Sequence, residues 1–518
     1  MAAAAAAGPG AGSDAPAPLT GARLVLAGLV LALANFIVVL DTTIANVSVP
    51  HISGGLAVSV SSGTWVITSY AVAEAICVPL TGWLANRFGA LRTFMFSLVG
   101  FGIFSTLCGL SGTLSALIVF RLGQGFCGGP LMPLTQTLLM RIFPKEMQNK
   151  AMAMWAMTVV TAPIAGPILG GYISDNWSWE WIFFINVPIV ALIFFGVAVL
   201  LRGQETPRQK QPIDKIGLLL LVVFVGAFQM MLDLGREEDW FSSTKIVALA
   251  CIAAVGFVAF LIWELTEEHP IVNISVFRHR GFAASTLSLT IAFGTYFSAI
   301  VIIPQWLQTS MGYTATEAGK ATAFSGVLAV VFSPFVPSLM KRFDPRLLVF
   351  IGVTWIGICS LMRMTWSTDI TFWTIAVPQL LQGAGVALMI VPLTTIGLSS
   401  VLPQETASAA GIANFGRTLA GAVATAIMTT VWSDMSRARS DELSGTLNGS
   451  QATSEMLQQQ GFTVEQARVA IAQMVESQGT AVATGELFVV SAIALFLAAT
   501  TIWLAPRPPK NVKPADGH

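Results

Sequence analysis

Three ionisable residues lie inside long apolar stretches of this chain, where a bare charge is costly. Asp41, Glu74 and Arg121 fall in three different stretches. If each stretch is a helix, rising about 1.5 Å per residue, all three lie roughly 12–15 Å below the end that we place outside. A carboxylate that alternates between water and an arginine partner takes up and releases a proton. The three residues are therefore candidates for a proton-coupling site.

Each of these residues also has a purely structural interpretation. For Arg121 and Glu74 the alternative is a static ion pair. For Asp41 it is a cap or a packing hydrogen bond with Thr42 or Thr43.

Further polar, methionine and aromatic residues in the apolar stretches are candidates for binding a hydrophobic substrate. Around Arg121, polar residues recur at helical spacing and form a stripe that is too polar for lipid. Methionine and aromatic surfaces adapt to varied apolar ligands, whereas amides and a guanidinium supply directional contacts. Packing or lipid contact is the alternative for the methionine and aromatic members. The candidates are Gln124, Met132, Gln136, Trp155, Tyr296, Gln305, Gln382, Asn414 and Arg417.

The composition excludes a water-soluble protein. Residues of the types AVILMFWYC fill 54% of 518 positions and only 10% are charged, against roughly 25% in a soluble domain. The 27 basic and 27 acidic residues balance, which gives no indication of a nucleic-acid partner. The five cysteines are far apart, and neither metal-ligand spacing nor a phosphate-binding loop occurs. We therefore expect no cofactor, no metal site and no enzymatic activity.

The apolar stretches predict an all-α membrane protein with fourteen transmembrane helices. A spanning helix needs about 20 mostly apolar residues. Stretches of this kind lie at 24–49, 64–85, 92–111, 114–140, 151–174, 181–201, 216–234, 245–264, 282–304, 319–340, 347–364, 371–398, 407–431 and 485–505.

The distribution of Lys and Arg predicts the orientation, because cytoplasmic loops carry an excess of both. With the N-terminus inside, 18 of the 27 basic residues fall in inner segments, 7 in outer segments and 2 within spans. The outer seven include Arg363, at the outer end of stretch 347–364. Both termini are therefore expected in the cytoplasm.

The chain contains an internal repeat. Gln124-Gly125 and Gln382-Gly383 lie 258 positions apart, and each precedes a Pro-Leu-Thr sequence by a similar distance. Paired repeats with a binding site between them are typical of secondary transporters. We predict two six-helix halves with two helices inserted between them. The predicted division is a disordered tail 1–22, a first half 23–201, a linker 202–215, inserted helices 216–264, a linker 265–281, a second half 282–505 and a tail 506–518.

An outer segment at 432–484, rich in Gln, Ser and Thr, interrupts the second half. Its part Ser454–Gln478 has apolar residues at helical spacing. Loops of this length usually have a function of their own or are disordered.

Five short stretches resemble signature motifs of the major facilitator superfamily, and within it the fourteen-span drug:proton antiporters of the EmrB/QacA group, the EmrB type in particular. In that group the fourth-helix motif is linked to proton coupling, which the resemblance assigns to Arg121. The stretches are Leu40–Pro50, Gly82–Arg92, Arg121–Gly125, Ala165–Gly171 and Trp181–Pro188, and with the similar stretch Asn414–Gly421 the likeness runs from Arg23 to Pro506.

The resemblance also implies residues that serve the conformational change. One set forms the signature loop after the second span, although Asn86 stands where that loop normally has an Asp. A second set forms the antiporter motif of the fifth span, as a hinge or a seal against leak, with tight helix packing as the alternative. The two sets are Gly82, Arg87, Gly89 and Arg92, and Gly166, Pro167, Gly170 and Gly171.

The function that the resemblance implies is proton-driven export of hydrophobic drug-like compounds by alternating access, from the bacterial inner membrane. EmrB-type members work with a periplasmic membrane-fusion adaptor and an outer-membrane channel, and segment 432–484 favours such docking. Beyond protons, drugs and membrane lipids we expect no other partner. The alternative is a dedicated exporter of one endogenous compound, such as a siderophore, a lipid or an antibiotic.

Overall fold

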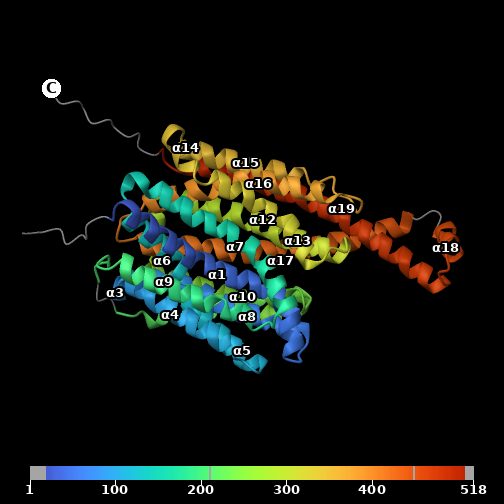
Figure 1. Ribbon diagram of the computed structural model, residues 1–518, viewed down its shortest axis with the longest axis horizontal. Coiled ribbons are helices and arrows are strands. Elements are labelled where there is room, and N and C mark those ends of the chain that lie inside the picture. Colours follow the sequence, from blue (N-terminus) through green and yellow to red (C-terminus); the bar gives the residue numbers. More distant parts are fainter. Residues whose placement is uncertain (1–18, 209–211, 447–449, 508–518) are drawn as a thin grey trace, which may run out of the picture.

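The computed structural model describes residues 19–208, 212–446 and 450–507, and these residues form helices joined by short connections (Figure 1). The α-helices are α1 (Gly21–Gly55), α2 (Val60–Gly63), α3 (Trp65–Phe88), α4 (Ala90–Gly109), α5 (Leu114–Gly128), α6 (Leu131–Ile142), α7 (Gln148–Asn176), α8 (Trp181–Phe184), α9 (Asn186–Leu200), α10 (Lys215–Gly235), α11 (Thr244–Thr266), α12 (Arg280–Ser310), α13 (Ala315–Phe332), α14 (Val336–Arg342), α15 (Pro345–Leu361), α16 (Phe372–Ser399), α17 (Thr406–Thr446), α18 (Ser450–Gln459) and α19 (Val464–Thr501). Short 3₁₀ turns lie at Lys145–Met147, Trp240–Ser242, Ile274–Arg278 and Ile502–Leu504.

Each of the fourteen predicted stretches corresponds to a helix or to a broken pair of helices. Breaks separate α5 from α6 at Gly129-Pro130 and α8 from α9 at Ile185, and α13 and α14 meet at a bend of 51°. Within the described residues, 11 helices are long and apolar enough to span a membrane, or 12 if the bent pair is one span. Helix α15, with 17 residues, is at the lower limit for a spanning helix and is not among these helices. The number fourteen therefore stays a prediction.

The bundle has two distinct ends. In Figure 1 helix α1 begins and helix α19 finishes at the same end, whereas α18 and the adjoining parts of α17 and α19 project beyond the other end. Near the first end, the Arg23 side chain donates to the Leu200 carbonyl over 3.1 Å. There too, Arg346 donates to the Ala505 carbonyl over 2.9 Å. An even number of crossings follows from this arrangement.

The two Gln-Gly pairs pack in the same way in the two parts of the bundle. An added Cβ on Gly125 of α5 would lie 2.4 Å from the Tyr70 carbonyl oxygen of α3. An added Cβ on Gly383 of α16 would lie 2.4 Å from the Ser325 carbonyl oxygen of α13. Only glycine permits these approaches. The pair α10–α11 lies beside α3 and α17 and touches both parts.

Segment 432–484 is largely helical, because α17 and α19 continue past the bundle as an antiparallel pair. Trp432 donates its indole N–H to Thr484 over 2.8 Å, and Arg439 binds Glu486 over 2.5 Å. The helix predicted over Ser454–Gln478 is broken by a turn at 460–463, where Gly461 has a φ of +96°. A capping box formed by Thr463 and Gln466 then starts α19.

Candidate proton-coupling and substrate sites

The sequence-predicted residues Asp41 and Arg121 form a buried ion pair. The Arg121 guanidinium lies 2.6 Å from the Asp41 carboxylate, and the two residues are 0% and 2% exposed. The second carboxylate oxygen accepts hydrogen bonds from Gln124 over 2.9 Å and from Asn186 over 2.7 Å. Four residues from helices α1, α5 and α9 thus make one closed network, in which the amide nitrogen of Gln124 binds Asp41 and its amide oxygen binds Arg121. A role of Gln124 in substrate binding stays a prediction.

The guanidinium of Arg121 is held on several sides. Its Nε donates to the Val66 carbonyl over 3.0 Å, and the group lies 4.3 Å from the centre of the Tyr70 ring. Its Nη2 has no hydrogen-bond partner among the described residues. Breaking such a pair leaves an uncompensated charge in a low-dielectric interior, which is strongly unfavourable.

Asn186, at the first turn of α9, is a member of this network that the sequence did not single out for a role. Its amide nitrogen reaches both the Asp41 carboxylate and the Ser105 hydroxyl, the latter over 3.0 Å. The signal was present: an amide follows five apolar residues and precedes Val-Pro in a signature stretch. Its side chain can hydrogen-bond to Asp41 in the charged and in the protonated form, since an amide both donates and accepts.

Glu74 does not join the ion pair. It lies one turn along α3 from Tyr70, is half-buried, and makes no hydrogen bond or ion pair with the described residues. Its strongest electrostatic interaction with a basic group is with Arg417 of α17, followed by Arg121. Glu74 thus lies between an arginine of the first half and one of the second, where its charge acts on both.

A second cluster joins the two halves. Asn414 of α17 donates its amide to Gln136 of α6 over 2.6 Å, and Arg417 donates to Asn414 over 3.2 Å. The Arg417 guanidinium also contacts the Met132 sulfur and lies over the rings of Phe293 and Trp155, at 4.8 and 5.8 Å from their centres. Five predicted substrate residues therefore meet at one interface.

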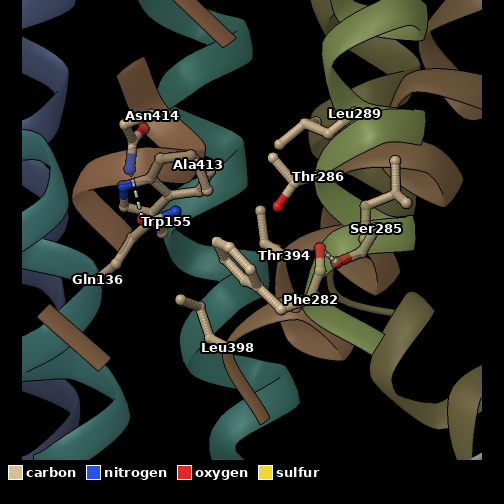
Figure 2. Close-up of a pocket in the computed structure, with 12 residues that line it drawn as sticks. Gln136, Trp155, Phe282, Ser285, Thr286, Leu289, Thr394, Leu398, Ala413 and Asn414 are labelled. Atoms are coloured by element: carbon tan, nitrogen blue, oxygen red, sulfur yellow. Dashed lines mark hydrogen bonds between the residues drawn. The ribbon is translucent and has the colours of Figure 1, made fainter. Parts of the chain in front are cut away.

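A small cavity, with room for about one water molecule, lies beside this cluster (Figure 2). Its volume of about 20 Å³ is far below that of the pockets that hold small-molecule ligands. In Figure 2 the Gln136–Asn414 hydrogen bond and Trp155 form one wall, facing Thr286 and Leu289 across the space. The lining residues are Gln136, Trp155, Phe282, Ser285, Thr286, Leu289, Leu393, Thr394, Gly397, Leu398, Ala413 and Asn414.

Three other predicted substrate residues lie away from this cavity. Tyr296 and Gln382 lie in the second half beside Arg363, and Gln382 accepts a hydrogen bond from the Arg363 guanidinium. Gln305 lies near the far end of α12 and does not line the cavity. Arg363 itself, which the sequence places in an outer connection, is 0% exposed. Its side chain turns inward from the end of α15, so counting charges in a loop did not reveal its position.

The predicted conformational glycines lie where helices approach closely. An added Cβ on Gly82 would lie 2.7 Å from the Ser408 Cα, which joins α3 of the first half to α17 of the second. Gly166 lies against Thr43, and Gly170 against the backbone of Ile44, so α7 packs tightly on α1. Gly171 lies 3.8 Å from Thr316 by the same measure. Pro167 is within α7, but its side chain is outside the described residues.

The signature loop after α3 receives an acidic partner from a distant linker. Gly89 has a φ of +96°, and the backbone N–H groups of Leu91 and Arg92 donate to the Glu205 carboxylate over 3.0 and 3.1 Å. The Arg92 side chain lies 3.9 Å from Glu205, and Arg87 lies over the Trp83 ring. A carboxylate at the N-terminus of α4 satisfies free N–H groups and the helix dipole.

No group of three or more His, Cys, Asp or Glu side chains within the described ranges is arranged to hold a metal ion.

Comparison with known proteins gives consistent matches over nearly the whole chain. Residues 31–425 match the family model of the Major Facilitator Superfamily. The chain is 44% identical over 496 residues to the multidrug export protein EmrB of Escherichia coli K12, covering 95% of this chain and 97% of that protein. It is 41% identical over 495 residues to the fatty acid resistance protein FarB of Neisseria gonorrhoeae, covering 95% and 98%.

Among solved structures, the proton:xylose symporter XylE has a similar fold. The TM-score is 0.59 at 14% identity, with 94% of this chain and 96% of that chain covered. At this identity the likeness concerns the fold alone.

The ion pair makes an asymmetric prediction about stability. In Asp41→Asn the buried Arg121 keeps its charge, because a guanidinium does not lose its proton, and we expect a loss of about 3–5 kcal/mol in unfolding free energy. In Arg121→Met the remaining carboxyl group becomes neutral by taking up a proton, so the loss is smaller. Thermal unfolding of both purified variants in detergent measures the difference. Equal losses, or a larger one for Arg121→Met, would contradict this account.

The Glu205 contact predicts a second effect. Glu205→Ala removes the acceptor for two N–H groups of α4, and we expect a loss of about 0.5–2 kcal/mol in unfolding free energy. Glu205→Gln keeps one acceptor oxygen and is the matched control, with a smaller loss. Unchanged thermal stability of Glu205→Ala would show that the linker does not anchor the loop.

Proposed function

Because the chain belongs to the major facilitator superfamily, we propose that it is a proton-driven multidrug efflux transporter, a secondary active exporter of hydrophobic drug-like compounds. The relative named multidrug export protein EmrB is similar over almost its full length. The protein is a multi-pass membrane protein of the bacterial inner membrane. The start of α1 and the finish of α19 lie at one end of the bundle, and we infer from the excess of Lys and Arg in the segments expected there that this end faces the cytoplasm.

The observation that carries the proposal is the buried Asp41–Arg121 pair with Glu74 beside it. When Asp41 takes up a proton, its carboxyl group becomes neutral and the attraction to Arg121 is lost. Gln124 and Asn186 then hydrogen-bond to a neutral acid in place of a carboxylate. The freed charge of Arg121 then acts on Glu74, which links the pair to the interface between the halves. Proton uptake thereby changes contacts that hold the two halves together.

Drug binding acts on the same interface from the cavity side. A ligand that enters beside Trp155 displaces or parts the Gln136–Asn414 hydrogen bond and changes the surroundings of Arg417. Glu74 interacts with Arg417, so a ligand bound beside Arg417 changes the electrostatic interaction that favours the charged form of Glu74. One proton moving through 100 mV supplies about 2.3 kcal/mol, which corresponds to roughly a 50-fold gradient of substrate.

Alternating access requires the halves to part on one side at a time. Near the end where α1 begins, Gly82 touches Ser408, and at the other end Gly171 of α7 faces Thr316 of α13. Small residues meet at both contacts, so the helices can separate or come together there without a rearrangement of large side chains. The glycines of α3 and α7 thus serve as the surfaces on which the halves rock.

The projecting helices are suited to dock a periplasmic adaptor that leads to an outer-membrane channel. Around the turn between α18 and α19, large apolar side chains are exposed, whereas the rest of this segment is rich in Gln and Ser. Apolar side chains gathered on an extramembrane tip mark a contact with another protein. They are Met456, Phe462, Val464, Val469 and Met474.

A dedicated exporter of one endogenous compound is the second candidate. One relative, 41% identical, is named for resistance to a single class of compound, fatty acids. A resistance profile distinguishes the two functions: a deletion strain that becomes sensitive to a single compound favours the dedicated exporter, whereas sensitivity to several unrelated drugs favours multidrug export.

Proton coupling is tested with Glu74→Gln and Asp41→Asn in reconstituted vesicles. We expect both to abolish drug transport driven by a pH gradient, while drug binding to purified protein persists, because neither change removes the cavity. Glu238→Gln, in the connection between α10 and α11, is the control and keeps full transport. Wild-type transport by both variants would remove these residues from the proton path.

Docking is tested at the tip of the projecting helices. Phe462→Asp combined with Val469→Asp should abolish drug resistance of whole cells, yet leave transport by purified protein in vesicles at the wild-type level. Arg437→Gln, exposed on α17, is the control. Resistance that survives the double change would contradict docking at this tip, and loss of vesicle transport would assign the tip to folding.

A further inference from the structure

Arg363 carries a positive charge in the interior of the second half, where no acidic residue meets it. It lies in the turn after α15 and is 0% exposed. Its Nη2 donates to the side-chain oxygens of Gln379, over 3.1 Å, and of Gln382. The other titratable groups whose charges act on it are Cys359 and Tyr296, which are both neutral at physiological pH.

Several N–H donors around Arg363 have no acceptor among the described residues. On Arg363 these are Nε and Nη1, and both are closed off from solvent. The indole N–H groups of Trp306 and Trp366 are also buried and without a partner. The Trp366 ring lies 5.9 Å from the Arg363 guanidinium and stacks on Trp306 with ring centres 5.5 Å apart. The cluster is thus rich in donors and poor in acceptors.

Such an arrangement is electrostatically incomplete. A buried charge without a counter-charge costs several kcal/mol or more, and buried donors are normally satisfied. Many buried groups escape this cost by losing their charge, but a guanidinium does not lose its proton. The missing component is therefore a negative charge that accepts hydrogen bonds.

The Arg363 cluster of the second half can be compared with the Arg121 cluster of the first half. The packing of Gly125 on Tyr70 and of Gly383 on Ser325 places residue n of α3 opposite residue n + 255 of α13. The offset between the Gln-Gly pairs of α5 and α16 is 258, and it puts Gln379 at the position of Arg121. Gln382 contacts Arg363 as Gln124 contacts Arg121, over 2.9 Å in the first half. The second half thus repeats the glutamine, whereas its guanidinium comes from the turn after α15, and no carboxylate acts on it among the described residues.

We infer that the second half binds a small monovalent anion, of the size of chloride, beside the Arg363 guanidinium. The Arg363 guanidinium supplies its counter-charge, and the unpaired N–H groups of Arg363 and of Trp366 donate hydrogen bonds to it. Because these nitrogens are closed off from solvent, the ligand that we propose is a single ion and not the body of a drug. The anion completes the second half as the Asp41–Arg121 pair completes the first.

Thermal unfolding of the purified full-length protein in detergent tests the site, with sodium chloride compared to sodium gluconate at equal ionic strength. A ligand that binds only the folded state raises the Tm in proportion to the logarithm of its concentration. We expect chloride at about 150 mM to raise the wild-type Tm by about 2 °C or more over gluconate. Bromide should act in the same way, and in crystals grown with bromide its anomalous signal should lie beside the Arg363 guanidinium.

Two variants assign the effect to this position. Arg363→Gln removes the charge and should lose the chloride response, whereas the control Arg437→Gln, on the exposed surface, should keep it. Gln382→Glu places a carboxylate in contact with Arg363. It should lose the chloride response and match or exceed the wild-type Tm in gluconate.

Three results would overturn the inference. One is an equal wild-type Tm in chloride and gluconate. Another is a chloride response that persists in Gln382→Glu, which remains informative if Arg363→Gln does not fold. The third is acetate that stabilises as strongly as chloride, which would assign the position to an organic carboxylate.

Discussion

A guanidinium keeps its proton even when it is buried, so each arginine inside this bundle requires a negative partner or a set of acceptors. Three arginines meet this requirement in three ways. Arg121 is paired with Asp41, Arg417 interacts with Glu74 across the interface of the halves, and Arg363 has only amide oxygens. The arrangement of helices around these charges follows from the need to bring acceptors to them, since unpaired charges are not tolerated within a membrane protein.

The three arginines differ in how readily the charge of their partner changes, and this difference gives them different roles. A carboxylate that faces an arginine is a switch, because protonation removes one of the two charges. The Asp41–Arg121 pair is closed within one half, whereas Glu74 and Arg417 belong to different halves. A change in protonation at the first site therefore alters the electrostatic attraction at the second, where the halves move. In contrast, Arg363 lacks an internal acid and serves a fixed role in the second half.

Sequence patterns predicted the helices and the membrane character, because apolar stretches about 20 residues long are unambiguous. They also predicted Asp41 and Arg121, since charges inside apolar stretches stand out. They missed Asn186, whose amide is ordinary in composition, and Glu205, whose role depends on a linker folding back over 100 residues. They misplaced Arg363, because a residue near a helix end reads as part of a loop while its side chain turns inward. Contacts between distant segments decide each of these cases, and single-sequence periodicity contains no information about them.

The most direct test of coupling is to measure proton release when drug binds to purified protein in a weakly buffered detergent solution with a pH indicator. If drug and proton compete through Glu74 and Asp41, adding a transported drug acidifies the solution with the wild-type protein, and the signal is lost with Glu74→Gln and Asp41→Asn. Drug binding without any proton release from the wild-type protein, or release that is unchanged in both variants, would contradict the account.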